Sequence, residues 1–156
     1  MRKKTKILEF WAVVLPVFIF SYILNFTWES IHSFLLYEEM NFLAKEYVAM
    51  VAYASMMDGF LVAGIFLAGC LFWKNLHWLS ILDKRRIAFI LLAGLLVGAF
   101  IEYKAVFLFS QWRYSGAMPV FLGVGLSPLF QLSITALLSI WITRMLLYQK
   151  GVYYGR

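Results

Sequence analysis

The sequence contains very little cysteine, proline and charge. Its 156 residues include one cysteine, Cys70, and three prolines, and only 14% of the residues are charged. A single cysteine excludes an internal disulfide and a metal or redox site of the Cys-x-x-Cys type. Because 63% of the residues are hydrophobic, the polar residues are too few to enclose a water-soluble globule. We therefore expect hydrocarbon to surround much of the chain.

Four long apolar stretches run through the sequence, at about 8–30, 47–73, 87–109 and 119–147. Each meets the roughly 20 residues that a helix needs to cross a bilayer. The predicted fold is all-α: a polytopic membrane protein with a four-transmembrane-helix bundle, in one domain over 1–156. The first stretch is too long for a signal peptide and lacks a small-x-small cleavage site, so we expect it to be retained.

Basic residues alternate between the connections of these stretches. The N-terminal tail and the middle connection hold four each and the C-terminal end holds three, whereas the first and third loops hold one each, Lys45 and Arg113. Cytoplasmic segments carry the excess of Lys and Arg, so both termini are predicted in the cytoplasm of a multi-pass protein of the inner (plasma) membrane. The net charge of +6 then reflects topology, and we expect membrane lipids, and no nucleic acid, as partners.

Aromatic residues near the ends of the stretches mark the predicted interfaces. On the inner side these are Trp11, Trp73, Trp78, Trp141 and Tyr148, and on the outer side Trp28, Tyr37, Tyr47, Trp112 and Tyr114. Segment 31–46 mixes apolar residues with Glu38, Glu39, Lys45 and Glu46. We expect it to lie along the outer surface as a short amphipathic piece.

The start of the fourth stretch is rich in residues that break helices. Pro119, Gly123, Gly125 and Pro128 fall within ten positions. We expect a broken or re-entrant start over 115–127 and a regular helix from about Pro128, where proline suits the first helical turn. Non-helical backbone at membrane depth must be satisfied by protein or water, so this start is expected to line an internal cavity.

Small residues recur four positions apart in two of the stretches. Gly94 and Gly98 form one pair, and Gly59 and Ala63 form the other. Such pairs let neighbouring helices approach closely, and we expect them to pack helices within this bundle.

Polar residues gather in the predicted outer half of the bundle. In the first stretch they recur every three or four positions and therefore share one helical face: Ser21, Asn25, Trp28, Glu29 and His32. Asp58 is in the second stretch, and Ser127, Gln131 and Thr135 form a stripe in the fourth. Ionisable groups within spans cost about 3 kcal/mol each, so the retained ones are candidates for function.

Glu102 in the third stretch lies on the same side as Gly98 and Ala105. Small neighbours are typical of a helix-packed face, so Glu102 is expected to point inward. Lys104 falls on the opposite side and is expected to reach the outer interface. His77 is in the middle connection, away from this set.

We assign two roles within the polar set. The candidates for acid/base catalysis are Asp58, Glu102, Glu29 and His32. The candidates for substrate binding are Asn25, Trp28, Trp112, Arg113, Tyr114, Ser127 and Gln131. A solvated surface pair is an equal alternative for Glu29 and His32, and an interhelical hydrogen bond is the favoured role for Gln131. One histidine in this region is a weak metal signal, so we assign no metal and no cofactor.

Several of these motifs together resemble a known family. They are Trp28-Glu29-x-x-His32, Leu36-Tyr37, Asp58, Glu102, Trp112-x-Tyr114-x-x-x-Met118-Pro119 and Gly125-Leu126-Ser127-Pro128-Leu129-x-Gln131. The pattern resembles a group of small bacterial four-helix inner-membrane proteins of unassigned function and covers about 25–131. The resemblance implies a fold and a location but no reaction. A more distant likeness, of architecture only, is to the membrane-embedded lycopene cyclase and sterol isomerase folds.

Three functions are open from the sequence. The first is acid/base chemistry on, or binding of, a lipid or isoprenoid in a carboxylate-rich pocket of the outer half. The second is a non-catalytic small-molecule or ion transport element, which would call for a homo-oligomer because four spans hardly enclose an aqueous pathway. The third is a structural or accessory subunit of a larger membrane complex, in which the polar set specifies packing.

Overall fold

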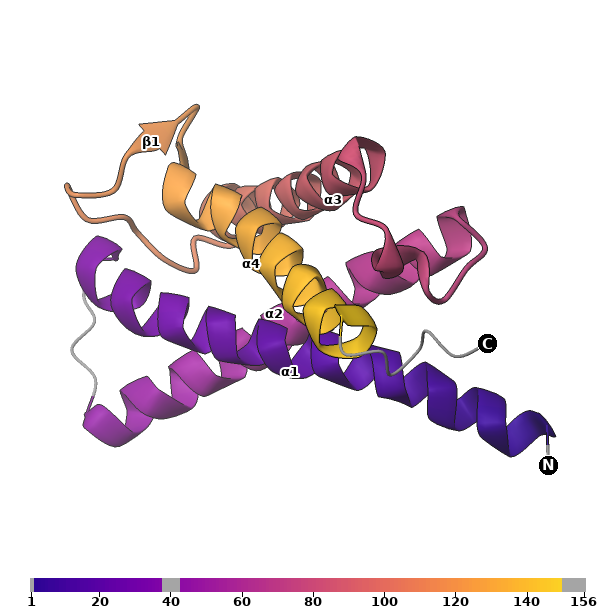
Figure 1. The fold of residues 1–156 in the computed structure, drawn as a ribbon. Coiled ribbons are helices and arrows are strands. Elements are labelled where there is room, and N and C mark those ends of the chain that lie inside the picture. The colour runs from indigo at the N-terminus through magenta and orange to yellow at the C-terminus, as the bar shows by residue number, and fades with distance from the viewer. Residues whose placement is uncertain (1, 38–42, 150–156) are drawn as a thin grey trace.

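The computed structural model describes residues 2–37 and 43–149, with residues 2–4 and 149 described by their backbone alone. Four long helices dominate this part of the chain: α1 (Arg2–Leu36), α2 (Ala44–Phe72), α3 (Lys84–Tyr103) and α4 (Leu126–Arg144). A 3-10 turn, η1 (Trp78–Ser80), lies in the middle connection, and π-helical turns extend α3 (η2, Lys104–Leu108) and α4 (η3, Met145–Gln149). The chain reverses direction between successive helices (Figure 1).

Each long helix contains a stretch that is long and apolar enough to cross a membrane. These stretches are Thr5–Leu36, Ala44–Phe72, Lys84–Leu108 and Leu126–Tyr148. The predicted bundle of four apolar helices is confirmed, and it is compatible with a multi-pass membrane protein.

The end of α1 differs from the sequence prediction. Residues 31–36, expected in a separate surface segment, continue the helix without a break. No glycine or proline lies between Pro16 and Leu36 to stop it. Lys45 and Glu46 belong to the first turn of α2. Residues 38–42 of the expected segment, and the basic residues Lys150 and Arg156, lie outside the described residues.

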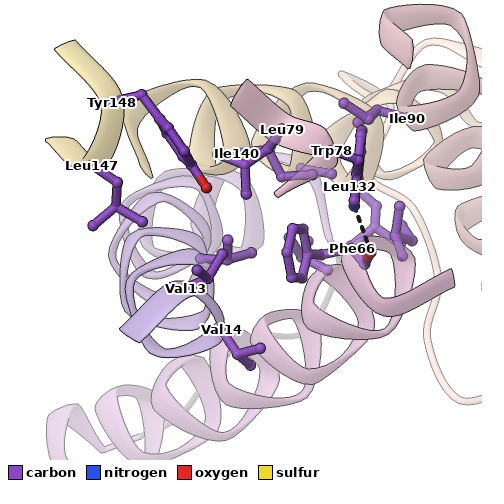
Figure 2. Packing of buried hydrophobic residues seen from close by; sticks show 14 residues of the cluster. Val13, Val14, Phe66, Trp78, Leu79, Ile90, Leu132, Ile140, Leu147 and Tyr148 are labelled. Atoms are coloured by element: carbon purple, nitrogen blue, oxygen red, sulfur yellow. Dashed lines mark hydrogen bonds between the residues drawn. The ribbon is translucent and has the colours of Figure 1, made fainter. Parts of the chain in front are cut away.

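The hydrophobic core occupies the half of the bundle where α1 begins and η3 ends (Figures 1 and 2). Helix α1 packs against α2 and α4, and α3 packs mainly on α4. The core includes Val13, Phe66, Trp78 and Ile140, each with none of its surface exposed. The opposite half of the bundle holds Glu29, Asp58, Glu102 and Gln131.

Trp78 and Tyr148, expected near a membrane interface, are buried in this core and do not face lipid. Turn η1 folds the middle connection back into the bundle, and Trp78 Nε1 donates a hydrogen bond to the Phe66 carbonyl at 3.1 Å (Figure 2). Its ring lies on Gly69, where a Cβ would be 2.5 Å from the indole. Tyr148 is only 9% exposed. Hydropathy alone does not separate a buried aromatic side chain from an interfacial one.

The small residues of α3 allow close packing on α4, as predicted. A Cβ at Gly94 would lie 2.5 Å from Ser133 Cα, and one at Gly98 would lie 3.2 Å from the Leu129 carbonyl oxygen. This contact brings the face of α3 that carries Glu102 against the start of α4.

The start of α4 is non-helical, as predicted, and forms a small hairpin. Strand β1 (Val120–Phe121) pairs antiparallel with β2 (Val124–Gly125). The turn uses left-handed backbone at Leu122 and at Gly123 (φ +80°), a conformation that suits glycine. Helix α4 begins at Leu126, two residues before the expected Pro128.

Candidate functional site

A single amide on α4 joins three helices at the end of the bundle opposite the core. Gln131 is 5% exposed, and its Nε2 donates toward Asn25 Oδ1 at 3.2 Å, Glu29 Oε1 at 2.6 Å and Asp58 Oδ2 at 3.1 Å. An amide nitrogen carries two hydrogens, so three acceptors share two bonds. We call these four residues the Gln131 network. It confirms the interhelical hydrogen bonding expected of Gln131.

The other atoms of the network are held by α1 itself. Asn25 Nδ2 donates to the Ser21 carbonyl at 3.0 Å and to its hydroxyl at 3.1 Å. Ser33 donates to the second oxygen of Glu29 at 3.1 Å. These i to i+4 bonds follow from the predicted polar face, and they orient Asn25 and Glu29 toward Gln131.

A second carboxyl lies between α3 and the third connection. Glu102 is 4% exposed, as the small residues around it predicted, and its Oε2 accepts a hydrogen bond from the Tyr114 hydroxyl. Burial, and then this bond to Glu102, raise the pKa of Tyr114 from 10.0 to about 12. The phenol is therefore neutral at physiological pH and serves Glu102 as a donor.

Tyr37 contacts three other rings near Glu102. Its ring contacts the rings of His32, Tyr114 and Trp112, with centroids 5.0, 5.7 and 5.8 Å apart. Burial raises the pKa of Tyr37, and the charges of Glu102 and Glu29 raise it further. We call Glu102, Tyr114, Trp112, Tyr37 and His32 the Glu102 cluster.

The third connection is fixed to the end of α1 by backbone bonds. Tyr114 forms an antiparallel bridge with Tyr37, and the Ser115 amide donates to the Leu36 carbonyl at 2.9 Å. This pairing places Tyr114 beside Glu102 although the connection has little regular structure. It also explains why the sequence did not assign Tyr37 to the site: its role comes from a contact with residues almost 80 positions away. Its place in the Leu36-Tyr37 motif was the available signal.

None of the three carboxyl groups forms an ion pair in the described part of the chain. Within residues 2–37 and 43–149 the ion pair is between Glu9 and His77, at the core end. A carboxyl group in an apolar interior needs a proton, hydrogen-bond donors or a cation. Gln131 donates to Glu29 and Asp58, Ser33 donates to Glu29, and Tyr114 donates to Glu102. No cation among the described residues pairs with any of the three.

Several buried side-chain nitrogens in the same region lack a hydrogen-bond partner among the described residues. They are Trp28 Nε1, Trp112 Nε1 and both ring nitrogens of His32, which is 4% exposed. Trp112 Nε1 lies beside Glu102 and Tyr114 but outside hydrogen-bond geometry to either. An unsatisfied buried polar group costs about 1–3 kcal/mol, so this concentration favours a surface that receives a polar ligand.

An open cavity of about 620 Å³ adjoins the Glu102 cluster. Its walls include Val106, Ser110, Trp112, Arg113, Tyr114 and Met118. Trp112 and Tyr114 belong to both the cavity wall and the cluster. The structure thus brings the predicted residues Trp112 and Tyr114 together with Glu102, and Arg113 lies beside them on the cavity wall. The segment before α4 lines this cavity, as expected, but the cavity is open and not internal.

Two predicted features are not joined to the rest by a contact. Ser127 lies one turn before Gln131 and is half-buried, but its side chain makes no hydrogen bond among the described residues. Lys104 lies away from Glu102, with its Nζ 5.3 Å from the ring centre of Phe100 and 5.5 Å from that of Phe109. In the described part of the chain, no three His, Cys, Asp or Glu side chains are grouped to hold a metal ion.

A separate polar cluster at the core end was not expected from the sequence. His77 Nε2 lies 2.9 Å from Glu9 Oε1, and His77 Nδ1 lies 2.6 Å from the Tyr148 hydroxyl. These bonds connect α1, the middle connection and η3. They account for the position of His77 far from Glu29, Asp58 and Glu102.

Comparisons with protein-family models, with curated proteins and with solved structures found no match for this chain. The resemblance to small four-helix bacterial membrane proteins therefore stays a prediction.

Proposed function

We propose that the protein is an intramembrane enzyme that performs acid/base chemistry on a lipid or isoprenoid. The observation that carries this proposal is the meeting of Glu29 and Asp58 at Gln131, within electrostatic range of a third carboxyl, Glu102, which lies against Tyr114; among the described residues no cation pairs with any of the three. In this proposal the helices span the inner membrane with both termini in the cytoplasm, and the site opens toward the outer side.

The proposed reaction moves a proton between two carbons of the substrate. Glu102, held by Tyr114, donates a proton to a double bond. The rings of Tyr37 and Trp112 stabilise the positive charge that develops. Glu29 or Asp58 removes a proton from a neighbouring carbon, and the double bond has shifted. Proton gain and loss balance in the substrate, and exchange with solvent returns the proton to Glu102 and removes it from Glu29 or Asp58, so this isomerisation requires no cofactor.

Solvent deuterium tests the proposal. Purified protein is reconstituted in vesicles made from the total lipid extract of the organism that encodes it, and the vesicles are incubated in D₂O. Mass spectrometry then measures carbon-bound deuterium in the lipids. We expect one lipid class to gain deuterium with the wild type. Glu102→Gln and Asp58→Asn should slow the exchange at least about 100-fold, the usual contribution of a general acid or base.

Glu46→Gln is the matched control, because this exposed carboxyl lies in the first turn of α2, outside the site. It should exchange like the wild type. The proposal is wrong if folded wild-type protein labels no lipid beyond the level of Glu102→Gln.

The Gln131 network favours a second candidate, a structural role in which these polar groups hold the helices together. In that case Asp58→Asn and Glu29→Gln would lower the folding yield or stability, and no lipid would be labelled by the wild type.

A further inference from the structure

We propose that the cavity beside Glu102 binds the anionic headgroup of an amphiphilic substrate, and that Arg113 is the counter-charge. This inference rests on the proposed function and names the substrate class for that site. It begins from the charge of the cavity wall, which holds Arg113 next to Trp112 and Tyr114.

Arg113 has no partner among the described residues. Its side chain is exposed and forms no ion pair or hydrogen bond there. Two other arginines differ: Arg86 donates to the Ile81 carbonyl at 2.7 Å, and Arg144 donates to the Ser80 carbonyl at 2.9 Å. A guanidinium at the wall of a cavity, with all its donors available, suits a phosphate or carboxylate group.

Trp112 supplies a second donor on the same wall. Its buried Nε1–H has no acceptor in the described part of the chain, and it lies beside Glu102 and Tyr114. An oxygen close to the headgroup can accept this bond. A headgroup at Arg113 would then place the adjoining part of the molecule at Trp112 and Tyr114, the wall residues that lie beside Glu102.

Exposed apolar side chains lie in the segments that adjoin the cavity, which favours an amphiphile over a free anion. The neighbouring η2 turn and the β1–β2 hairpin expose Leu108 (60%), Phe121 (61%) and Leu122 (83%), and the hairpin stands at the end of the bundle in Figure 1. Val106 and Val120 continue this apolar surface into the cavity wall. A hydrocarbon chain can follow it while the charged group stays at Arg113.

Binding of three probes in non-ionic detergent tests the inference: farnesyl phosphate, farnesol and inorganic phosphate. Titration calorimetry measures each Kd. We expect farnesyl phosphate to bind at least tenfold more tightly than farnesol, and inorganic phosphate at millimolar concentration not to displace it. Arg113→Gln should weaken farnesyl phosphate at least tenfold and leave farnesol unchanged. Arg113→Lys should recover part of the loss.

Lys104→Gln is the matched control, because it removes a nearby cation that lies away from Glu102. It should change the Kd by less than twofold. Equal affinity for farnesol and farnesyl phosphate overturns the inference. So does an equal weakening of farnesyl phosphate binding by Arg113→Gln and Lys104→Gln. Displacement by inorganic phosphate would assign the site to a free anion.

The two proposals fail separately, because binding is measured without turnover. Selective binding of farnesyl phosphate without deuterium exchange would support the headgroup site and contradict the proposed enzymatic activity. If the wild type exchanges deuterium but binds both farnesyl compounds equally, the headgroup site alone is contradicted.

Discussion

Replacing Gln131 by methionine should weaken the association of the three helices that its amide joins. Methionine has a similar volume but no donor, so the change removes the hydrogen bonds to Asn25, Glu29 and Asp58 and leaves the packing nearly intact. The amide has two hydrogens, and interhelical bonds in membranes average about 0.6 kcal/mol, with a maximum of about 1.7 kcal/mol. The expected loss is therefore about 1–3 kcal/mol in the free energy of unfolding.

The assay is reversible unfolding by sodium dodecyl sulfate in mixed micelles, followed by tryptophan fluorescence. Gln111→Met is the control, because Gln111 is exposed and its side chain makes no hydrogen bond in the described part of the chain. It should unfold like the wild type. If Gln131→Met is also within about 0.3 kcal/mol of the wild type, the network does not hold the bundle together, and Gln131 serves a ligand instead.

Three further changes test other parts of the structure. Tyr114→Phe removes the donor to Glu102. Because the pKa of Tyr114 is raised from 10.0 to about 12, the stability of the wild type should fall as the pH rises through that range. A pH titration of the free energy of unfolding should show a shallower fall for the variant. Gly94→Ala places a Cβ 2.5 Å from the backbone of α4 and should cost about 1–3 kcal/mol in the same assay, whereas Gly64→Ala, with nothing within 4 Å, should be neutral or stabilising. His77→Phe removes two hydrogen bonds at the core end, so amide hydrogen exchange in residues 145–149 should accelerate roughly tenfold, and unchanged exchange would contradict this role.

The polar site was only partly predictable. Relations within one helix could be predicted from the sequence, whereas contacts between helices could not. The face of α1 that carries Asn25 and Glu29 follows from a spacing of three or four residues. The inward direction of Glu102 follows from Gly98 on the same side. The partner of each group does not follow, because periodicity does not set the rotation or depth of one helix against another. Contacts such as Gly94 against Ser133 set them.

The connections were less predictable than the helices. The prolines and glycines before α4 predicted a break, and the structure has one there. They did not predict the bridge between Tyr37 and Tyr114 that completes the Glu102 cluster. The same limit applies to Trp78, whose burial depends on a turn that folds back over Gly69.

The sequence by itself determined the four apolar helices and the gathering of polar residues toward one end, because hydropathy and helical spacing are local properties of the chain. Only the tertiary structure decided that Gln131 reaches Glu29 and Asp58, that Tyr114 donates to Glu102, and that Arg113 stands without a partner at the wall of a cavity in the part of the chain described. These relations join residues up to about 100 positions apart, and close packing of the helices sets them.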